Sequence, residues 1–157
     1  NGQSSASSSR VGVIESVQRS SQRSLTVAVN CYQQLIQLKR VINKDYKAFK
    51  EKPVLYPDEC QSIRDCVAQF IKPVQELLKF MEHPKHSQTV LPKKWEITKR
   101  LHHVEALCND ILDDMFEYCV CCQYIPNDKQ QEINQKMEDM KGELKTLCKL
   151  LKVIFAL

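Results

Sequence analysis

The chain has 157 residues, which is enough for one domain that buries roughly two thirds of its unfolded surface. Hydrophobic residues make up 43% and charged residues 27%, and this balance excludes an intrinsically disordered chain. The formal charge of +4 is too small for a dedicated nucleic-acid-binding domain, so we expect no nucleic-acid partner.

Turn-forming residues are scarce, with 3 glycines and 6 prolines in the whole chain. Few turns in a chain of this length imply few, long elements, which favours helices over a many-stranded sheet. Residues 1–10 are instead Ser-rich and of low complexity, a composition typical of flexible linkers. We predict a flexible linker or lead-in over residues 1–21 and a folded domain over residues 22–157.

Four segments with helical periodicity follow, at about 22–50, 57–81, 92–124 and 127–157. In the last three, apolar residues recur at alternating intervals of four and three, the spacing of left-handed helix bundles. These rows are Cys60, Ile63, Val67, Phe70, Val74, Leu77 and Met81; Ile97, Leu101, Val104, Cys108, Ile111, Met115, Tyr118 and Cys122; and Ile133, Met137, Met140, Leu144, Leu147, Leu151 and Ile154. The first segment has the less regular row Leu25, Ala28, Tyr32, Leu35, Ile42, Tyr46 and Phe49, interrupted at Lys39.

The breaks between the segments agree with this periodicity. Pro57 and Pro92 suit the first turn of a helix, where the missing N–H has no cost, and Asn127 suits an N-cap. The short connections force consecutive helices to be antiparallel neighbours. We therefore predict an all-α fold, an antiparallel up-down-up-down four-helix bundle. Pro73 lies within the second segment without changing the phase of its row, which predicts one kinked helix rather than two.

Enzyme signatures are absent from the sequence. With so few glycines there is no phosphate-binding loop or dinucleotide fingerprint. His102 and His103 are adjacent on a helix and point about 100° apart, so they do not form a pair of metal ligands. Cys119 and Cys122 form a Cys-x-x-Cys near a helix C-terminus, where the dipole does not activate a thiol. We expect no catalytic residue, no cofactor and no metal, and hence not an enzyme.

The 8 cysteines mostly fall inside helical patterns rather than in loops. They are Cys31, Cys60, Cys66, Cys108, Cys119, Cys121, Cys122 and Cys148. Reduced thiols that pack as small hydrophobic groups explain this placement, and they predict a cytoplasmic protein. Titration of free thiols distinguishes this interpretation from a secreted helical cytokine with disulfides.

Four acidic residues cluster on the third segment at Asp110, Asp113, Asp114 and Glu117. None lies on the apolar row, whereas metal-binding bundles place their carboxylates inside the core. The sequence therefore predicts a solvated acidic face opposite Lys136 or Lys141 of the antiparallel fourth segment.

Apolar and basic residues away from the rows are the candidate partner-binding residues. They are Leu112, Phe116 and Val120 on the third segment, and Lys141, Lys145, Lys149, Leu150 and Val153 on the fourth. One interpretation is that both helices bury a broad apolar face. The other is a groove that receives an amphipathic helix, with lysines that favour an acidic partner.

The leading functional hypothesis is a non-catalytic adaptor or scaffold domain of a signalling or cytoskeletal protein. In fold alone, this architecture resembles focal-adhesion-targeting and vinculin-type bundles, which bind short helical motifs. The alternative is a membrane-docking or membrane-active bundle, in which the basic C-terminal helix makes weak contact with an anionic membrane.

Overall fold

The computed structural model describes the backbone of residues 2–51, 57–83, 87–120 and 125–157. Within these ranges it describes side chains from residue 22 onward, apart from residues 48, 49, 51, 87–92, 117, 119 and 120. The described chain is helical and contains no strand, which confirms the predicted all-α class.

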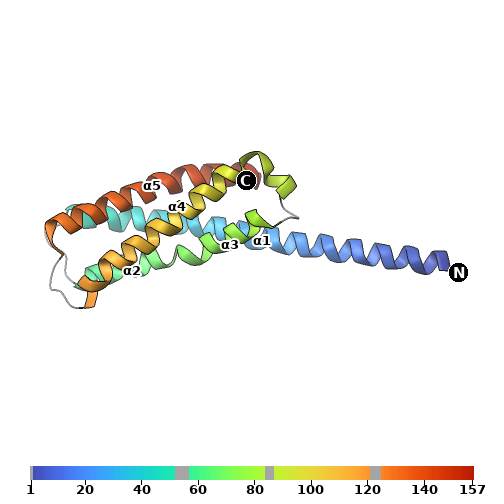
Figure 1. Ribbon diagram of the computed structural model, residues 1–157, viewed down its shortest axis with the longest axis horizontal. Coiled ribbons are helices and arrows are strands. Elements are labelled where there is room, and N and C mark those ends of the chain that lie inside the picture. The colour runs from blue at the N-terminus through green and yellow to red at the C-terminus, as the bar shows by residue number, and fades with distance from the viewer. Residues whose placement is uncertain (1, 52–56, 84–86, 121–124) are drawn as a thin grey trace.

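Five helices make up the described chain (Figure 1). They are α1 (Gly2–Glu51), α2 (Pro57–Ala68), α3 (Ile71–Glu82), α4 (Ser87–Val120) and α5 (Asn127–Ile154). α4 begins before Pro92 rather than at it, and α5 begins at Asn127, with Pro126 in the cap position. The predicted Asn127 cap is therefore displaced by one residue.

The N-terminal segment differs from the expected linker. Residues 2–21 continue α1 as helix, and Figure 1 shows them extending beyond the rest of the molecule. Once a helix exists, each added residue gains a hydrogen bond without a new nucleation step, so α1 can extend into a Ser-rich stretch. The flexibility of residues 1–21 stays a prediction.

The predicted kinked helix is instead two helices, interrupted at Gln69 and Phe70, with Pro73 in the first turn of α3. Pro73 lacks an N–H, so it cannot donate to the carbonyl of Gln69, and the helical ladder is interrupted there. The N–H of Phe70 instead bonds to the carbonyl of Val67, over three residues, at 3.1 Å. Phe70 and Val74 are nevertheless both fully buried, so α2 and α3 present one continuous apolar row.

The helices enclose a core with α1 and α4 at opposite corners. α1 packs against α2, α3 and α5, and α4 packs against the same three helices, as Figure 1 shows. Cross-helix contacts give the register: Tyr46 reaches Asn134, and Tyr32 reaches Phe155. The part of α1 around Tyr32 thus lies beside the C-terminal end of α5, and the part around Tyr46 lies beside the first turns of α5.

The predicted apolar rows form the core. Every described row residue of α2 and α3 is buried, as are those of α4 from Ile97 to Met115 and those of α5 from Ile133 to Leu151. In α1 the row is buried from Ala28 to Tyr46, but Leu25 is 44% exposed, so its prediction as a core residue is wrong. The side chains of Phe49 and Cys122 lie outside the described residues. Among the described residues, no helix combines the length and apolar character needed to cross a lipid bilayer.

Candidate partner-binding surfaces

The predicted partner-binding residues lie on three different faces of the bundle. Leu112 and Phe116 lie on the side of α4 that faces α2, because Arg64 of α2 contacts both residues. Lys141 and Lys145 continue the row of Glu138, on the side of α5 that faces α1. Lys149 follows Lys145 after one helical turn.

Leu150 lies on a third face, on the side of α5 that faces α4, because it falls seven residues after Glu143, which pairs with α4. Val153 lies one helical turn after Lys149, on the outer side of α5 between Leu150 and Lys149. Leu150 is half-buried against the core and Val153 is 74% exposed. The side chain of Val120 lies outside the described residues. The structure therefore brings the predicted residues together only in groups of two or three.

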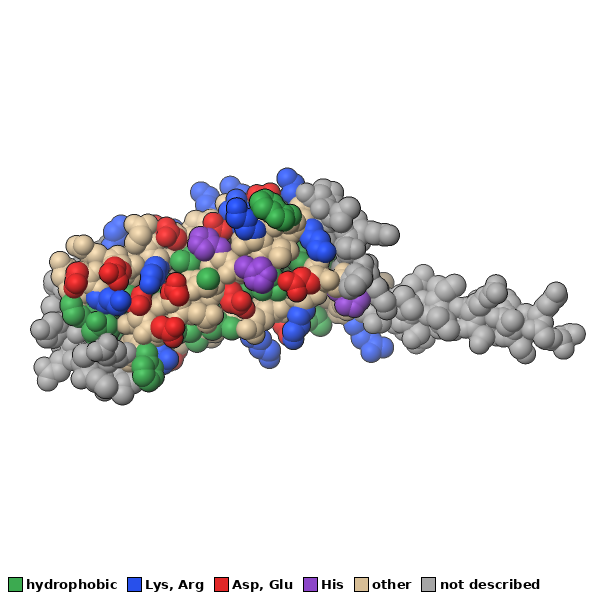
Figure 2. Space-filling model, in the orientation of Figure 1, with side chains coloured by type: hydrophobic (Ala, Val, Ile, Leu, Met, Phe, Trp, Pro, Cys, Tyr) green, Lys and Arg blue, Asp and Glu red, His purple; other side chains and the backbone are tan. Residues whose placement is uncertain are grey.

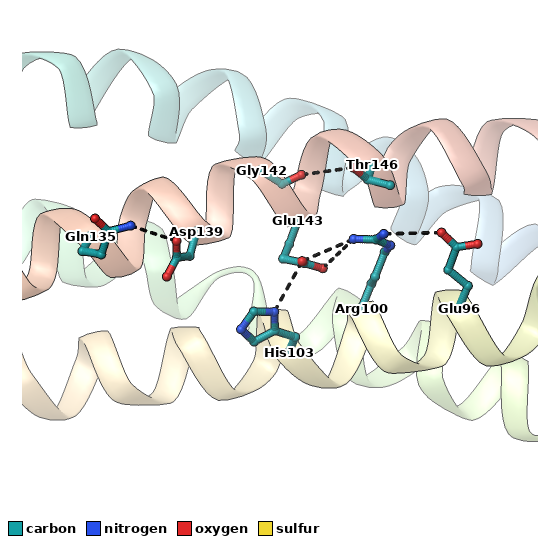
Figure 3. A network of polar contacts seen from close by, with 8 residues as sticks. All are labelled: Glu96, Arg100, His103, Gln135, Asp139, Gly142, Glu143 and Thr146. Atoms are coloured by element: carbon teal, nitrogen blue, oxygen red, sulfur yellow. Dashed lines mark hydrogen bonds and ion pairs between the residues drawn. The ribbon is translucent and has the colours of Figure 1, made fainter.

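A polar network joins α4 to α5 at this third face (Figure 3). The guanidinium of Arg100 donates to both carboxylate oxygens of Glu143, at 3.2 and 3.3 Å, and also contacts Glu96 at 3.4 Å. Nδ1 of His103 lies 3.5 Å from Glu143. Both hydrogen bonds to Glu143 come from Nη1 of Arg100, and Nη2 donates to Glu96, so the guanidinium links α4 to α5 through Glu143.

A cleft of about 550 Å³ lies beside this network. It is lined by Trp95, Glu96, Lys99, Arg100, His103 and Glu143. Trp95 is 75% exposed, and the ammonium of Lys99 lies 5.0 Å from the centre of its ring. An indole exposed to this extent is uncommon on a folded surface and is the side chain most enriched at binding hot spots.

The register of the two helices places Trp95 at about the same level along the bundle as Leu150 and Val153. Because Arg100 pairs with Glu143 and Asp114 pairs with Lys129, Trp95 lies about level with position 148. Leu150 and Val153 are then about 3 and 7.5 Å farther along α5. Side chains in helices lean toward the N-terminus, so those of Trp95 and Val153 lean toward each other. We call Trp95, Leu150 and Val153 the tryptophan site.

Trp95 is missing from the binding residues predicted from sequence, because it belongs to no periodic row and to no charged cluster. A usable signal was present: Trp95 precedes the row residue Ile97 by two positions, which turns it far from the core on a helix. It is also the only tryptophan in the chain.

Phe116 lies in a different environment. Its ring is 54% exposed, and the guanidinium carbon of Arg64 lies 5.1 Å from the ring centre. Nε of Arg64 also donates to the carbonyl oxygen of Leu112 at 3.4 Å. Arg64 therefore covers part of the apolar surface that was expected, from the sequence, to bind a partner.

One residue of the acidic cluster of α4, Asp114, pairs with α5, and Lys136 is a partner as predicted. Nζ of Lys136 donates to Asp114 at 2.6 Å, and Nζ of Lys129 lies 3.2 Å from the same carboxylate. Burial alone would raise the pKa of Asp114, but the hydrogen bonds from the two lysines outweigh it and hold this pKa below its ordinary value. The alternative partner, Lys141, lies on the other side of α5, facing α1.

Five cysteines have free thiols in the core: Cys31, Cys60, Cys66, Cys108 and Cys148. Burial, with a smaller contribution from nearby carboxylates, raises the pKa of Cys66 to about 11 and that of Cys108 to about 12. These thiols therefore pack as hydrophobic groups and are poor nucleophiles. The side chains of Cys119, Cys121 and Cys122 lie outside the described residues. Within the described part of the chain, no three His, Cys, Asp or Glu side chains are placed to hold a metal ion.

The chain matches no protein-family model, no curated protein and no solved structure. What the protein binds must therefore be inferred from its own surfaces.

Proposed function

We propose that this protein is a non-catalytic interaction domain that binds a short amphipathic helix at the tryptophan site, along the seam between α4 and α5. One observation carries the proposal: Trp95 is 75% exposed beside a cleft of about 550 Å³. Large exposed aromatic residues next to a concavity are characteristic of anchoring positions in protein interfaces.

The seam between α4 and α5 has the form that a helix-in-groove interaction needs. A partner helix lying along it would place apolar residues on Trp95, Leu150 and Val153, with the spacing of one helical face. The Arg100–Glu143 pair joins the two groove walls before binding, which lowers the ordering cost of association.

The charges around Trp95 favour an acidic partner. Lys93 and Lys99 are exposed and Lys94 is half-buried, and none of the three has a carboxylate within ion-pair distance among the described residues. A carboxylate of the partner placed near Lys99 would keep the lysine over the Trp95 ring and add an ion pair at the rim.

We infer an up-down-up-down topology for the bundle that carries this site. Contacts between Arg64 and Leu112, and between Glu82 and His102, support an antiparallel arrangement of α2 and α3 with α4. Contacts of α1 with α5 and of α4 with α5 support the same arrangement for those pairs. An adaptor or scaffold role in the cytoplasm is consistent with buried free thiols.

The single tryptophan gives a direct test. Synthetic helical peptides with one apolar face, differing only in whether the opposite face is acidic, neutral or basic, would be titrated into the protein while Trp95 emission is recorded. We expect the acidic peptide to shift the emission to shorter wavelength and to protect Trp95 from iodide quenching. Binding of all three peptides with no change in emission would disprove the tryptophan site.

Matched variants separate the site from the rest of the surface. Val153→Ser should weaken binding of the acidic peptide about tenfold, because it removes an apolar contact next to the indole. Val41→Ser changes an equally branched, exposed side chain on α1, and should leave binding unchanged. Equal losses in both variants would indicate non-specific adsorption.

A further inference from the structure

Lysine and arginine side chains gather on the outer face formed by α1 and α5. Arg40 and Lys47 continue the row of Lys50 on α1, and Lys50 faces α5 through Glu138 at 3.9 Å. Lys141, Lys145 and Lys149 occupy the corresponding side of α5. We call the exposed set Arg40, Lys44, Lys47, Lys141, Lys145 and Lys149 the basic face.

The register of α1 and α5 brings the two halves of the basic face together. Lys39 lies close enough to Cys148 to lower the thiol pKa slightly against the larger effect of burial, and Tyr46 reaches Asn134. The stretch around residues 39–47 of α1 therefore runs beside residues 134–148 of α5. The cations of the two helices form one continuous surface rather than two separate patches.

The cations of the basic face have no intramolecular partners among the described residues. Elsewhere, Lys129 and Lys136 pair with Asp114, and Arg100 pairs with Glu143. The only carboxylate in the two rows is Glu138, which lies near Lys50 and Tyr46. Lysines held together without counter-charges repel one another, so an anionic surface that lies across them relieves this repulsion.

Opposite the basic face, the molecule has a mixed surface. Figure 2 shows acidic, basic and histidine side chains together on this face, with Lys and Arg side chains projecting along the upper edge of the view, over α5. Acidic residues such as Asp110, Asp113 and Asp139 are exposed away from the basic face. The unequal distribution of charge gives the molecule a preferred orientation toward a negatively charged surface.

We propose that the basic face docks on an anionic lipid surface. Among the described side chains of residues 36–50 and 134–153, the exposed large apolar ones are Val41 and Val153, and Ile36 and Leu150 are half-buried. Val153 lies one turn beyond Lys149, at the end of the basic face rather than at its centre. Val41 follows Lys39 by two positions, which turns it toward the side of α1 away from α5 and off the basic face. Protein interfaces need apolar anchors at their centre, whereas anionic headgroups bind clustered lysines by charge alone. The lipid contact is independent of the proposed helix binding, because it concerns a different face.

Vesicle co-sedimentation of the full chain tests this proposal. Phosphatidylcholine vesicles with increasing fractions of phosphatidylserine would be used at low and at physiological salt. We expect binding that rises steeply with phosphatidylserine, weakens with salt and is absent from pure phosphatidylcholine. Equal binding to pure phosphatidylcholine would show apolar insertion and overturn the proposal, as would the absence of binding to phosphatidylserine at low salt.

Matched charge reversals locate the binding face. The double variant Lys145→Glu/Lys149→Glu should lower partitioning onto phosphatidylserine vesicles at least about 25-fold, since each lysine near an anionic surface contributes about fivefold. The double variant Lys93→Glu/Lys99→Glu makes the same change in net charge on α4, and should lower partitioning far less. Circular dichroism would confirm that both remain folded, as expected for exposed positions.

Two outcomes of this comparison would overturn the proposal. Equal losses in the two variants would show that net charge, and not the basic face, controls binding. Tight binding of a generic duplex RNA or DNA that depends on Lys145 and Lys149, without vesicle binding, would assign the face to nucleic acid. Neither result would affect the peptide titration of Trp95, so the two proposals can fail separately.

Discussion

The two sides of α5 use lysine in opposite ways. Toward α4, Lys129 and Lys136 share the carboxylate of Asp114, and Glu143 receives Arg100. Toward α1, the contacts are made by Tyr32 and Tyr46, and the lysines extend into solvent without a described partner apart from the Lys50–Glu138 contact. On one helix, the same residue type therefore fixes a seam on one side and remains available for binding on the other.

Both seams depend on the same core, so a charge in the core should break both. Met115 is fully buried on α4. Met115→Asp would remove apolar contacts and place an unpaired carboxylate among them, which should destabilise the fold by about 5 kcal/mol or more. We expect loss of a cooperative thermal transition in circular dichroism. A melting temperature close to that of the wild type would contradict the burial of this row.

The α4–α5 seam should be the more sensitive to loss of a single charge. Asp114→Asn removes the carboxylate shared by two lysines and should lower the free energy of unfolding by about 1 kcal/mol in urea denaturation. Lys145→Gln, on the basic face, is the matched control and should change it by less than about 0.5 kcal/mol. Equal losses of unfolding free energy in the two variants would show that the two sides of α5 do not differ in how their charges stabilise the fold.

The carboxylate of Asp114 should also make the stability of the fold depend on pH. Because folding lowers the pKa of Asp114, its contribution to stability is present above the unfolded value of about 4 and is lost as pH falls through the lower folded value. The difference in unfolding free energy between wild type and Asp114→Asn should therefore shrink as pH is lowered below about 4. A difference that persists at the acid limit would show that it has another origin.

The α1–α5 seam should respond only weakly to loss of a polar contact. The hydroxyl of Tyr46 donates to the carbonyl of Asn134 at 3.5 Å, which is long for such a bond. Tyr46→Phe keeps the buried ring and should lower the free energy of unfolding by about 0.5 kcal/mol. The measurement is urea denaturation. A loss of several kcal/mol would contradict this expectation, because the Tyr46 hydroxyl would then stabilise the fold as much as the charged seam does.

The smallest effect on stability is expected at Phe116. Its ring is half exposed, so Phe116→Asp should change the unfolding free energy by less than about 0.5 kcal/mol. It should also leave binding of an acidic peptide at Trp95 unchanged, because Phe116 lies on the side of α4 that faces α2. Isothermal titration would check this. Loss of peptide binding in this variant would indicate that the peptide binds at the face that Leu112 and Phe116 share.

The sequence predicts the core well because burial repeats with the period of the helix. The alternation of four and three identifies fully buried residues such as Leu101, Ile111 and Leu144 without knowledge of their neighbours. The structure explains why Lys39 interrupts the first apolar row, since this lysine is half-buried at the seam with α5. Local periodicity is sufficient for this level of structure.

The faces are harder to predict because they depend on which helix lies on which side. A four-helix bundle can turn in either sense, and the opposite sense would place Lys141 and Lys145 beside α4 and Lys136 beside α1. Nothing in the spacing of these lysines distinguishes the two arrangements. The separation of Leu150 from Lys149 onto different faces follows from this choice.

The central claim is that the α4–α5 seam and the basic face bind different partners. The most direct test is to measure Trp95 emission with and without lipid vesicles. Protein saturated with phosphatidylserine vesicles, as verified by sedimentation, should show the same emission maximum and iodide quenching as free protein. Adding the acidic amphipathic peptide to that sample should then shift the emission to shorter wavelength. A shift on adding vesicles alone would place Trp95 at the membrane and contradict the assignment of the two faces.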